Sequence, residues 1–202
     1  MSMAAPTSYK APNPDELFDV VDSQDRVTGQ APRRQVHAEK WLHRAVHVLV
    51  HDDDGHLFLQ RRSPTKDTFP NCWDSSCSGH VDSGEDYHTA ARRELGEELG
   101  WKDAGLPLRP LLKLPASPET GYEFIQIYLL GPLSGPFDLH PEEITEGRWM
   151  TPTELDLLIA EHPGQVAGAL RLLWSQHRAA ILGEPGFESA NASGQSLKTL
   201  PS

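Results

Sequence analysis

Residues 79–101 read Gly-His-Val-Asp-Ser-Gly-Glu-Asp-Tyr-His-Thr-Ala-Ala-Arg-Arg-Glu-Leu-Gly-Glu-Glu-Leu-Gly-Trp. The second half of this stretch predicts a helix. Ser83 and Asp86 form a Ser-x-x-Asp capping pattern, acidic residues fill the expected first turn, and Gly100 is placed to end the helix. The rest of the chain is interpreted outward from this predicted helix.

Three carboxylates gather on one face of the predicted helix. At 100° per residue, Glu94, Glu97 and Glu98 fall within an arc of about 100°. Like charges three and four residues apart repel each other, so such a face needs a compensating interaction. A hard divalent cation, which takes oxygen ligands and leaves room for substrate phosphate oxygens, would supply it. A solvated acidic face is the alternative, and the glutamates alone do not decide between the two.

The spacing of the whole stretch favours the cation. It contains, in order, Gly79, five residues, Glu85, seven residues, Arg93-Glu94-Leu95, one residue, Glu97-Glu98, one residue, and Gly100-Trp101. This pattern resembles the signature of the Nudix hydrolases at every fixed position. The resemblance implies an α/β (α+β) fold, an α/β/α sandwich with a mixed β-sheet between helices. It also implies hydrolysis of a diphosphate linked to another moiety.

The same resemblance implies roles for the residues of the signature. The three glutamates of the helix would be metal ligands and part of the catalytic set. Glu85 and Arg93 would belong to that set through a salt bridge that holds the loop onto the helix. Gly79 would be a tight-turn residue whose carbonyl joins the metal site. The implied cofactor is Mg²⁺ or Mn²⁺.

Composition narrows the possible partners. The chain has 202 residues, a formal net charge of -11 and a pI near 5.3. This acidity argues against a nucleic-acid polymer or an anionic membrane as the main partner. A small-molecule diphosphate must then be met by local positive charge and by bound metal. The oligomeric state is left open, with a homodimer among the options.

The cysteines and the termini suggest the setting and the domain organisation. Cys72 and Cys77 lack metal-ligand spacing and predict small buried residues in a reduced, cytoplasmic protein. No signal peptide or run of about 18 apolar residues is apparent. The sequence predicts a mobile leader at residues 1–14, a single domain at residues 15–182 and a flexible tail at residues 183–202.

The coarse element order follows from turn and periodicity signals. A hairpin is predicted at 17–29, a short helix within 31–42, strands at 43–51, 56–61, 73–78, 106–114, 122–130 and 147–150, and helices from 151 and over 165–182. Thr151 and Pro152 supply a cap and a first helical residue for the penultimate helix.

Three cations precede the signature. Arg61 and Arg62 lie at the end of a predicted strand, and Lys66 follows in the next loop. Arginine suits bidentate phosphate contacts and lysine suits a point-charge contact. Beside a predicted metal site in an acidic protein, these residues predict a substrate-binding diphosphate clamp rather than a solvated basic patch.

A narrower resemblance covers residues 16–73. The segments that carry it are Val20-Val21-Asp22, Trp41-Leu42-His43-Arg44-Ala45, Arg61-Arg62-Ser63-Pro64-Thr65-Lys66 and Phe69-Pro70-Asn71-Cys72-Trp73. They resemble the type I isopentenyl diphosphate isomerases and their hydrolase-like relatives. This resemblance makes His80 a metal ligand and His43 and Glu123 weaker metal candidates. His37 is one residue out of register, so it is a weak candidate.

This sequence departs from the isomerases at two points. Ser78 occupies the position of the isomerases' catalytic cysteine, and Cys77, one residue earlier, would point to the other face of a strand. The glutamate signature, degraded in those enzymes, stands in full here. A hydrolase is therefore favoured, with isopentenyl diphosphate isomerase as the alternative. A non-catalytic nucleotide-binding module is the further alternative.

The predicted reaction is attack of water on a phosphorus of the diphosphate, assisted by the metal and the cation clamp. The sequence does not single out a general base. The candidates are Glu97, Glu98, Glu123, Glu142, Glu143 and Glu146. The histidines His47, His51, His56 and His140 are expected to be surface or strand residues rather than ligands.

Overall fold

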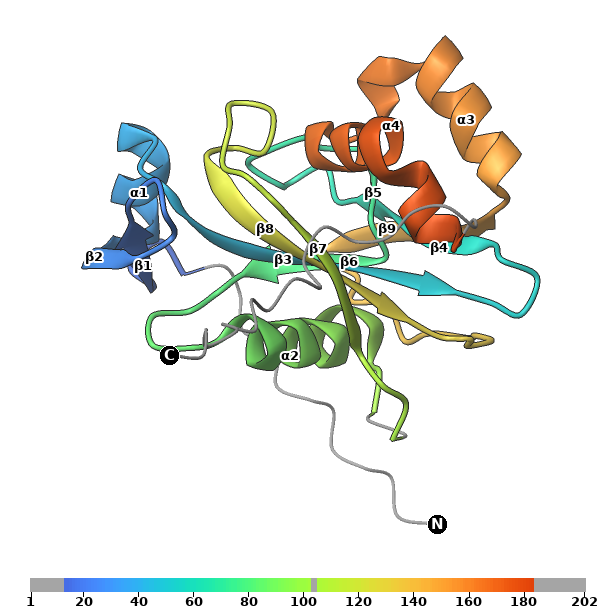
Figure 1. The fold of residues 1–202 in the computed structure, drawn as a ribbon, viewed down its shortest axis with the longest axis horizontal. Coiled ribbons are helices and arrows are strands. Elements are labelled where there is room, and N and C mark those ends of the chain that lie inside the picture. The colour runs from blue at the N-terminus through green and yellow to red at the C-terminus, as the bar shows by residue number, and fades with distance from the viewer. Residues whose placement is uncertain (1–12, 103–104, 184–202) are drawn as a thin grey trace, which may run out of the picture.

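The computed structural model describes residues 13–102 and 105–183 (Figure 1). Residues 1–12 of the expected leader and residues 184–202 of the expected tail lie outside the described residues. None of the helices in the described part of the chain has the length and apolar character needed to cross a membrane.

Nine strands and four α-helices make up the described fold. The strands are β1 (Leu17–Val21), β2 (Val27–Pro32), β3 (His43–His51), β4 (Leu57–Arg62), β5 (Trp73–Asp74), β6 (Cys77–His80), β7 (Arg109–Leu114), β8 (Glu123–Leu130) and β9 (Ile144–Met150). The helices are α1 (Arg33–Glu39), α2 (Tyr87–Leu99), α3 (Pro152–Glu161) and α4 (Gly168–Leu182), with a 3₁₀ turn η1 (Pro163–Gln165) before α4.

Seven of the strands form one mixed sheet around β3. The order along the main path is β5-β4-β3-β8-β7, with β6 paired to β3 and β9 paired to β4. The β3 strand runs parallel to β8 and antiparallel to β4 and β6. The predicted α/β architecture with a mixed sheet between helices is therefore confirmed.

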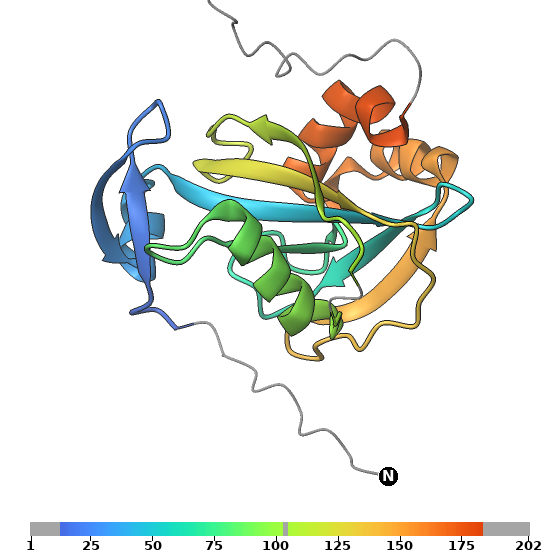
Figure 2. The same ribbon diagram turned by 60° about the horizontal axis from the view of Figure 1, so that its bottom comes forward.

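The helices cover the two faces of this sheet. Helix α2 lies on one face, and α3 and α4 lie on the other (Figures 1 and 2). The alternation along β3 explains this layering, because successive side chains point to opposite faces. Val46 and Val48 are buried in the core that contains Leu95 of α2. Ala45 and Leu49 are buried in the core on the side of α3 and α4.

The N-terminal hairpin and α1 form a small unit at one end of the sheet (Figure 1). Phe18 and Val36 are fully buried in its own small core. Asp25, in the turn between β1 and β2, accepts hydrogen bonds from Arg44 at 2.6 Å and from Tyr87 at 2.9 Å. These contacts connect the unit to the sheet and to α2.

The start of α2 differs from the prediction, whereas its end agrees with it. Asp86 is the N-cap and accepts from the Thr89 amide at 2.8 Å, and no acidic residue lies in the first turn. Ser83 instead donates to Asp19 at 2.7 Å, so the proposed Ser83 cap is wrong. Gly100 ends the helix in the left-handed conformation, with φ of 62°. Glycine adopts that conformation without a steric penalty.

Two other predicted boundaries change. The single strand expected at 73–78 is divided into β5 and β6, because Ser75 and Ser76 turn the chain between them. The last helix begins at Gly168 rather than near Gln165, which lies in η1. The cap expected at Thr151 is present. Its hydroxyl accepts from the Glu154 amide at 3.1 Å, in a full capping box.

Candidate functional site

A cavity lies where α1, β3, β6, α2, the loop after β4 and the start of α4 meet. Its lining combines carboxylates, imidazoles and cations from segments that are far apart in the sequence. The main ionisable residues of the lining are Arg33, His37, His47, Arg62, Lys66, Asp74, His80, Arg93, Glu94, Glu97, Glu98, Glu123 and Glu143.

Glu98 is the most tightly held carboxylate of the signature. It is 4% exposed, and its Oε2 accepts from Gln60 Nε2 at 2.9 Å and from the Ser78 amide at 3.0 Å. Gln60 is fully buried on β4, and Ser78 lies on β6. Two strands of the sheet therefore fix the orientation of a carboxylate that α2 carries into the cavity.

Arg93 organises the remaining carboxylates. Its guanidinium donates to Glu85 at 2.9 and 3.2 Å, so the salt bridge expected between the loop and the helix is present. It also donates to Glu94 at 2.6 Å, to Glu97 at 3.5 Å and to the carbonyl of His80 at 2.9 Å. Arg93 thus holds the loop, α2 and the end of β6 together.

The tight turn expected at Gly79 is absent. This residue lies in strand β6 rather than in a tight turn, and it makes no left-handed turn. A Cβ at this position would lie 2.0 Å from both Cδ and Oε1 of Glu94. Glycine is required here because the Glu94 carboxylate passes directly over the strand.

The charge on α2 fits a cation. Burial and the negative charge of Glu98 raise the pKa of Glu94 well above its usual range. A divalent cation accepting oxygen ligands from this face would offset that repulsion. Arg93 donates to both Glu94 and Glu97. In this arrangement the carboxylate oxygens of Glu94, Glu97 and Glu98 do not all lie within 4.8 Å of one another.

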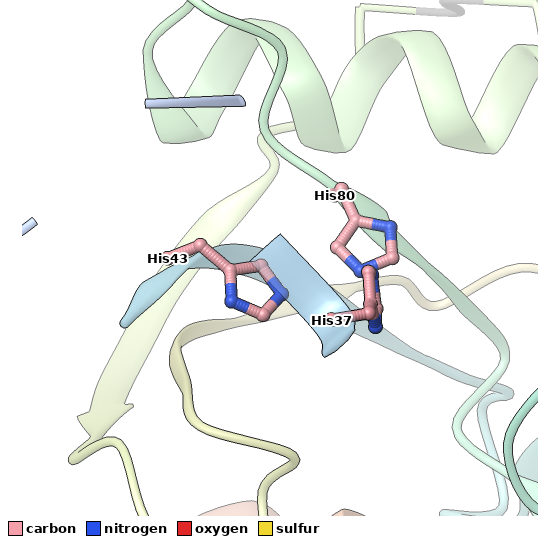
Figure 3. A group of neighbouring side chains, drawn as sticks. All are labelled: His37, His43 and His80. Atoms are coloured by element: carbon pink, nitrogen blue, oxygen red, sulfur yellow. The ribbon is translucent and has the colours of Figure 1, made fainter. Parts of the chain in front are cut away.

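Three histidines form a second, tighter group. One nitrogen from each of His37, His43 and His80 lies within 4.8 Å of the other two. Figure 3 shows the three rings facing one another from α1, β3 and β6. The Nε2 atoms of all three are buried and make no hydrogen bond. Glu123 Oε1 lies 3.5 Å from Nε2 of His43 and 3.2 Å from Nε2 of His80.

This donor set fits a transition-metal ion. Burial lowers the pKa of His37, and lowers that of His80 to about 3, so both rings are neutral near pH 7 and carry a free lone pair. Burial would raise the pKa of Glu123, but His43 and His80 hold it below its usual range. Imidazole nitrogens with one carboxylate suit ions such as Zn²⁺ or Mn²⁺ better than Mg²⁺.

His37 joins the group because it lies on α1 rather than on a strand. The resemblance to the isomerases made His37 a weak candidate, one residue out of register, but the helix places its ring 5.1 Å from that of His43. Phe18 stacks against His80 with ring centroids 4.6 Å apart, and it closes the group from the side of β1. The N-terminal unit is therefore part of the site.

A third set of possible ligands has a simpler explanation. Asp52, Asp54 and His56 lie in the turn between β3 and β4. Asp52 Oδ1 accepts from the amides of Asp54 at 3.0 Å and His56 at 2.8 Å, and Oδ2 lies 2.7 Å from His56 Nδ1. These contacts close the turn and account for the cluster.

The cations predicted as a clamp are not all in the cavity. Arg62 and Lys66 line it, whereas Arg61 points away and lies 3.7 Å from the exposed Glu146. Alternation along β4 places consecutive arginines on opposite faces. Arg62 pairs with Asp74 at 3.1 Å, and Lys66 pairs with Glu143.

Sequence reasoning missed three residues of the lining or its support. Arg33 enters from α1 and lies 3.5 Å from Asp67. Gln60 supports Glu98 from a strand with no distinctive motif. His47, expected to be a surface or strand residue rather than a ligand, lies on β3, is 6% exposed and lines the cavity. Its place in the alternation of β3 was the available signal.

Sequence comparison relates the chain to known proteins. The NUDIX domain model matches residues 41–172. An uncharacterized Nudix hydrolase of Yersinia pestis is 39% identical over 140 residues, which cover 69% of this chain and 75% of the relative. An isopentenyl-diphosphate Delta-isomerase 2 of Photorhabdus laumondii is 32% identical over 155 residues, covering 74% of this chain and 85% of the relative.

The fold has a close structural counterpart. The crystal structure of DR0079 from Deinococcus radiodurans superimposes with a TM-score of 0.69 at 34% sequence identity, covering 78% of this chain and 96% of that one. The family match, the relatives and the fold point to the same assignment. The chain belongs to the Nudix hydrolase family.

Proposed function

We propose that this protein hydrolyses a small-molecule diphosphate linked to another moiety, and that Glu94, Glu97 and Glu98 hold Mg²⁺ or Mn²⁺. The observation that carries the proposal is the buried Glu98 carboxylate, which two strands fix in a cavity that also contains Arg62 and Lys66. Residues 15–182 would act as one catalytic domain.

A bound divalent ion would supply Lewis acidity for water and neutralise charge on the phosphate oxygens. The chain's own residues would do the positioning. Arg62 and Lys66 are placed to contact phosphate oxygens, and Arg93 holds the glutamate face to the loop. The Gly79 carbonyl, on the strand beneath Glu94, would complete the oxygen ligands.

The placement of the cysteine supports hydrolysis over isomerisation. Cys77 is fully buried in the core beside α2 and does not line the cavity, whereas Ser78 of β6 does. Burial raises the pKa of the Cys77 thiol well above its usual range. Isomerisation of isopentenyl diphosphate would need an acidic group to protonate the alkene, and Ser78 does not supply one.

The direct test is a phosphate-release screen of nucleoside diphosphates, nucleotide sugars and isopentenyl diphosphate. We expect release that requires Mg²⁺ or Mn²⁺ and stops when a chelator is added. Proton exchange into isopentenyl diphosphate with no phosphate released would support the isomerase instead. Ligand binding without turnover in the presence of Mg²⁺ would support the non-catalytic module.

We further propose that His37, His43, His80 and Glu123 hold a transition-metal ion. The support is the convergence of three buried imidazoles without hydrogen bonds on Nε2, beside a carboxylate. Because the ligands come from α1, β3, β6 and β8, the ion would fasten the N-terminal unit to the sheet.

Saturating Zn²⁺ or Mn²⁺ should therefore stabilise the wild-type protein, by about 2.7 kcal/mol at a metal concentration 100-fold above Kd. His80→Gln should lose the stabilisation, as measured by thermal unfolding and by metal content after dialysis. His51→Gln, on β3 outside the cluster, is the matched control and should behave like the wild type. Equal metal content in His80→Gln and the control would contradict the assignment.

A further inference from the structure

His47 occupies a position that neither the glutamate face nor the histidine cluster uses. It lies on β3 directly opposite Ser78 of β6 in the antiparallel pairing. Opposed residues in such a pair have Cβ atoms about 5 Å apart on the same face of the sheet. The amide of Ser78 is the group that holds Glu98 at 3.0 Å. The imidazole therefore lies beside the strand that anchors a signature carboxylate, and both His47 and Ser78 line the cavity.

The contacts of Ser75 favour one tautomer of His47. Nδ1 of His47 lies 2.8 Å from Ser75 Oγ, and the same hydroxyl is placed to donate to the carbonyl of Cys77 at 3.2 Å. When the hydroxyl donates to that carbonyl, Ser75 Oγ accepts from His47 Nδ1–H. This arrangement puts the ring proton on Nδ1 and the lone pair on Nε2.

A carboxylate stands behind the ring. Asp74 Oδ1 lies 3.7 Å from His47 Nδ1 and accepts from the Ser75 amide at 2.8 Å. Asp74 Oδ2 accepts from Arg62 at 3.1 Å, which keeps this buried side chain in place. An anion on the Nδ1 side stabilises the imidazolium that forms when Nε2 takes a proton.

The carboxylates that could compete as bases are engaged elsewhere. Glu98 Oε2 accepts two hydrogen bonds from the sheet, and Arg93 binds both Glu94 and Glu97. Glu143 pairs with Lys66, and Glu142 and Glu146 are exposed and outside the cavity lining. Glu123 faces the histidine cluster.

We propose that His47 is a catalytic residue whose Nε2 accepts the proton of the attacking water, with Ser75 and Asp74 as positioning residues. The inference rests on the proposed hydrolysis. One O–H bond of water breaks and its proton moves to Nε2, while the oxygen forms a bond to phosphorus. The bridging P–O bond breaks, and its electron pair stays on the bridging oxygen, which leaves as part of the departing phosphate. The imidazolium then releases its proton to solvent.

Charged groups on several elements line the same cavity as this ring. Asp74 of β5 lies 3.7 Å from Nδ1, and Arg62 of β4 pairs with Asp74. The glutamates of α2 and the Lys66–Glu143 pair line the same cavity. A positioned general base contributes about 10²- to 10⁴-fold to the rate, and the pH profile of the rate shows whether such a base is required.

The test compares His47→Gln with His51→Gln on the substrate found in the release screen. We expect His47→Gln to lower kcat by about 10²- to 10⁴-fold, with little change in KM, and to remove the acidic limb of the pH profile. The control should keep both. Asp74→Asn should also lower kcat with little change in KM, because the ring loses the carboxylate that lies 3.7 Å from Nδ1. Thermal unfolding identifies folded variants, and His47→Asn serves if the glutamine variant does not fold.

A second readout does not depend on turnover. Long-range ¹H–¹⁵N NMR spectra of the full chain with Mg²⁺ should show the proton of His47 on Nδ1, and Ser75→Ala should give a mixture of tautomers. A proton on Nε2 in the wild type would overturn the proposal, as would full turnover with an intact acidic limb in His47→Gln. Failure of the proposed function is distinguishable, because the wild type itself would then release no phosphate, and the role of His47 would fall with it.

Discussion

Glu98→Gln should lower turnover by about 10²- to 10³-fold, the size expected when one preorganised electrostatic contact is lost. The reason is the pair of donors on Glu98 Oε2, namely Gln60 Nε2 at 2.9 Å and the Ser78 amide at 3.0 Å. In a glutamine, only the carbonyl oxygen can accept from these donors. The amide NH₂ would then take the place of the second oxygen, and it has no lone pair for a cation.

The fold should survive this change, because both hydrogen bonds to the carbonyl oxygen remain. Steady-state phosphate release and thermal unfolding measure the two effects. Glu97→Gln should act in the same direction, whereas Glu161→Gln, on the exposed end of α3, is the matched control. Full activity in both Glu97→Gln and Glu98→Gln would contradict the metal assignment on α2.

Gly79→Ala should reduce activity by about 10²-fold, the effect that a shift of about 1 Å in a catalytic group can have. A Cβ at this position would lie 2.0 Å from Cδ and 2.5 Å from Oε2 of Glu94. The obstructed group is the end of a flexible side chain, so Glu94 would swing away while β6 keeps its backbone. We therefore expect a large loss of turnover with a small change in stability.

Gly29→Ala is the control for this prediction, because a Cβ there would have no neighbour within 4 Å. Kinetics and thermal unfolding of the two alanine variants can be compared directly. A Gly79→Ala protein with wild-type turnover would show that the position of Glu94 is not critical. A protein that fails to fold would show instead that β6, rather than the side chain, takes up the strain.

Local signals in the sequence were sufficient to predict α2 and the placement of helices on both faces of the sheet. Gly100 ends the helix as its position predicts, and alternation along β3 separates the two cores. Ser83 shows the limit of such signals. Its capping pattern is sound locally, but Asp19, 64 residues away in the chain, takes its hydroxyl. A tertiary partner overrides a local preference of similar strength.

The other contacts that the sequence did not predict also join residues far apart in the chain. His47 and Ser75 are 28 residues apart and meet because β6 folds back on β3. Gln60 reaches Glu98 across 38 residues. Neither contact can be recognised from a sequence motif, because each requires only a single polar side chain at a buried position. The requirement for Gly79 likewise comes from Glu94 passing over it rather than from a turn.

The paired cations of the cavity determine how an anion can bind there. Arg33, Arg62 and Lys66 already lie against Asp67, Asp74 and Glu143, respectively. A guanidinium has five N–H donors and an ammonium three, so a phosphate that binds there would share each cation with its carboxylate. The carboxylates would lower the net positive charge that the phosphate meets, and binding would be weaker than at unpaired cations. When the product leaves, each cation would keep its internal counter-ion.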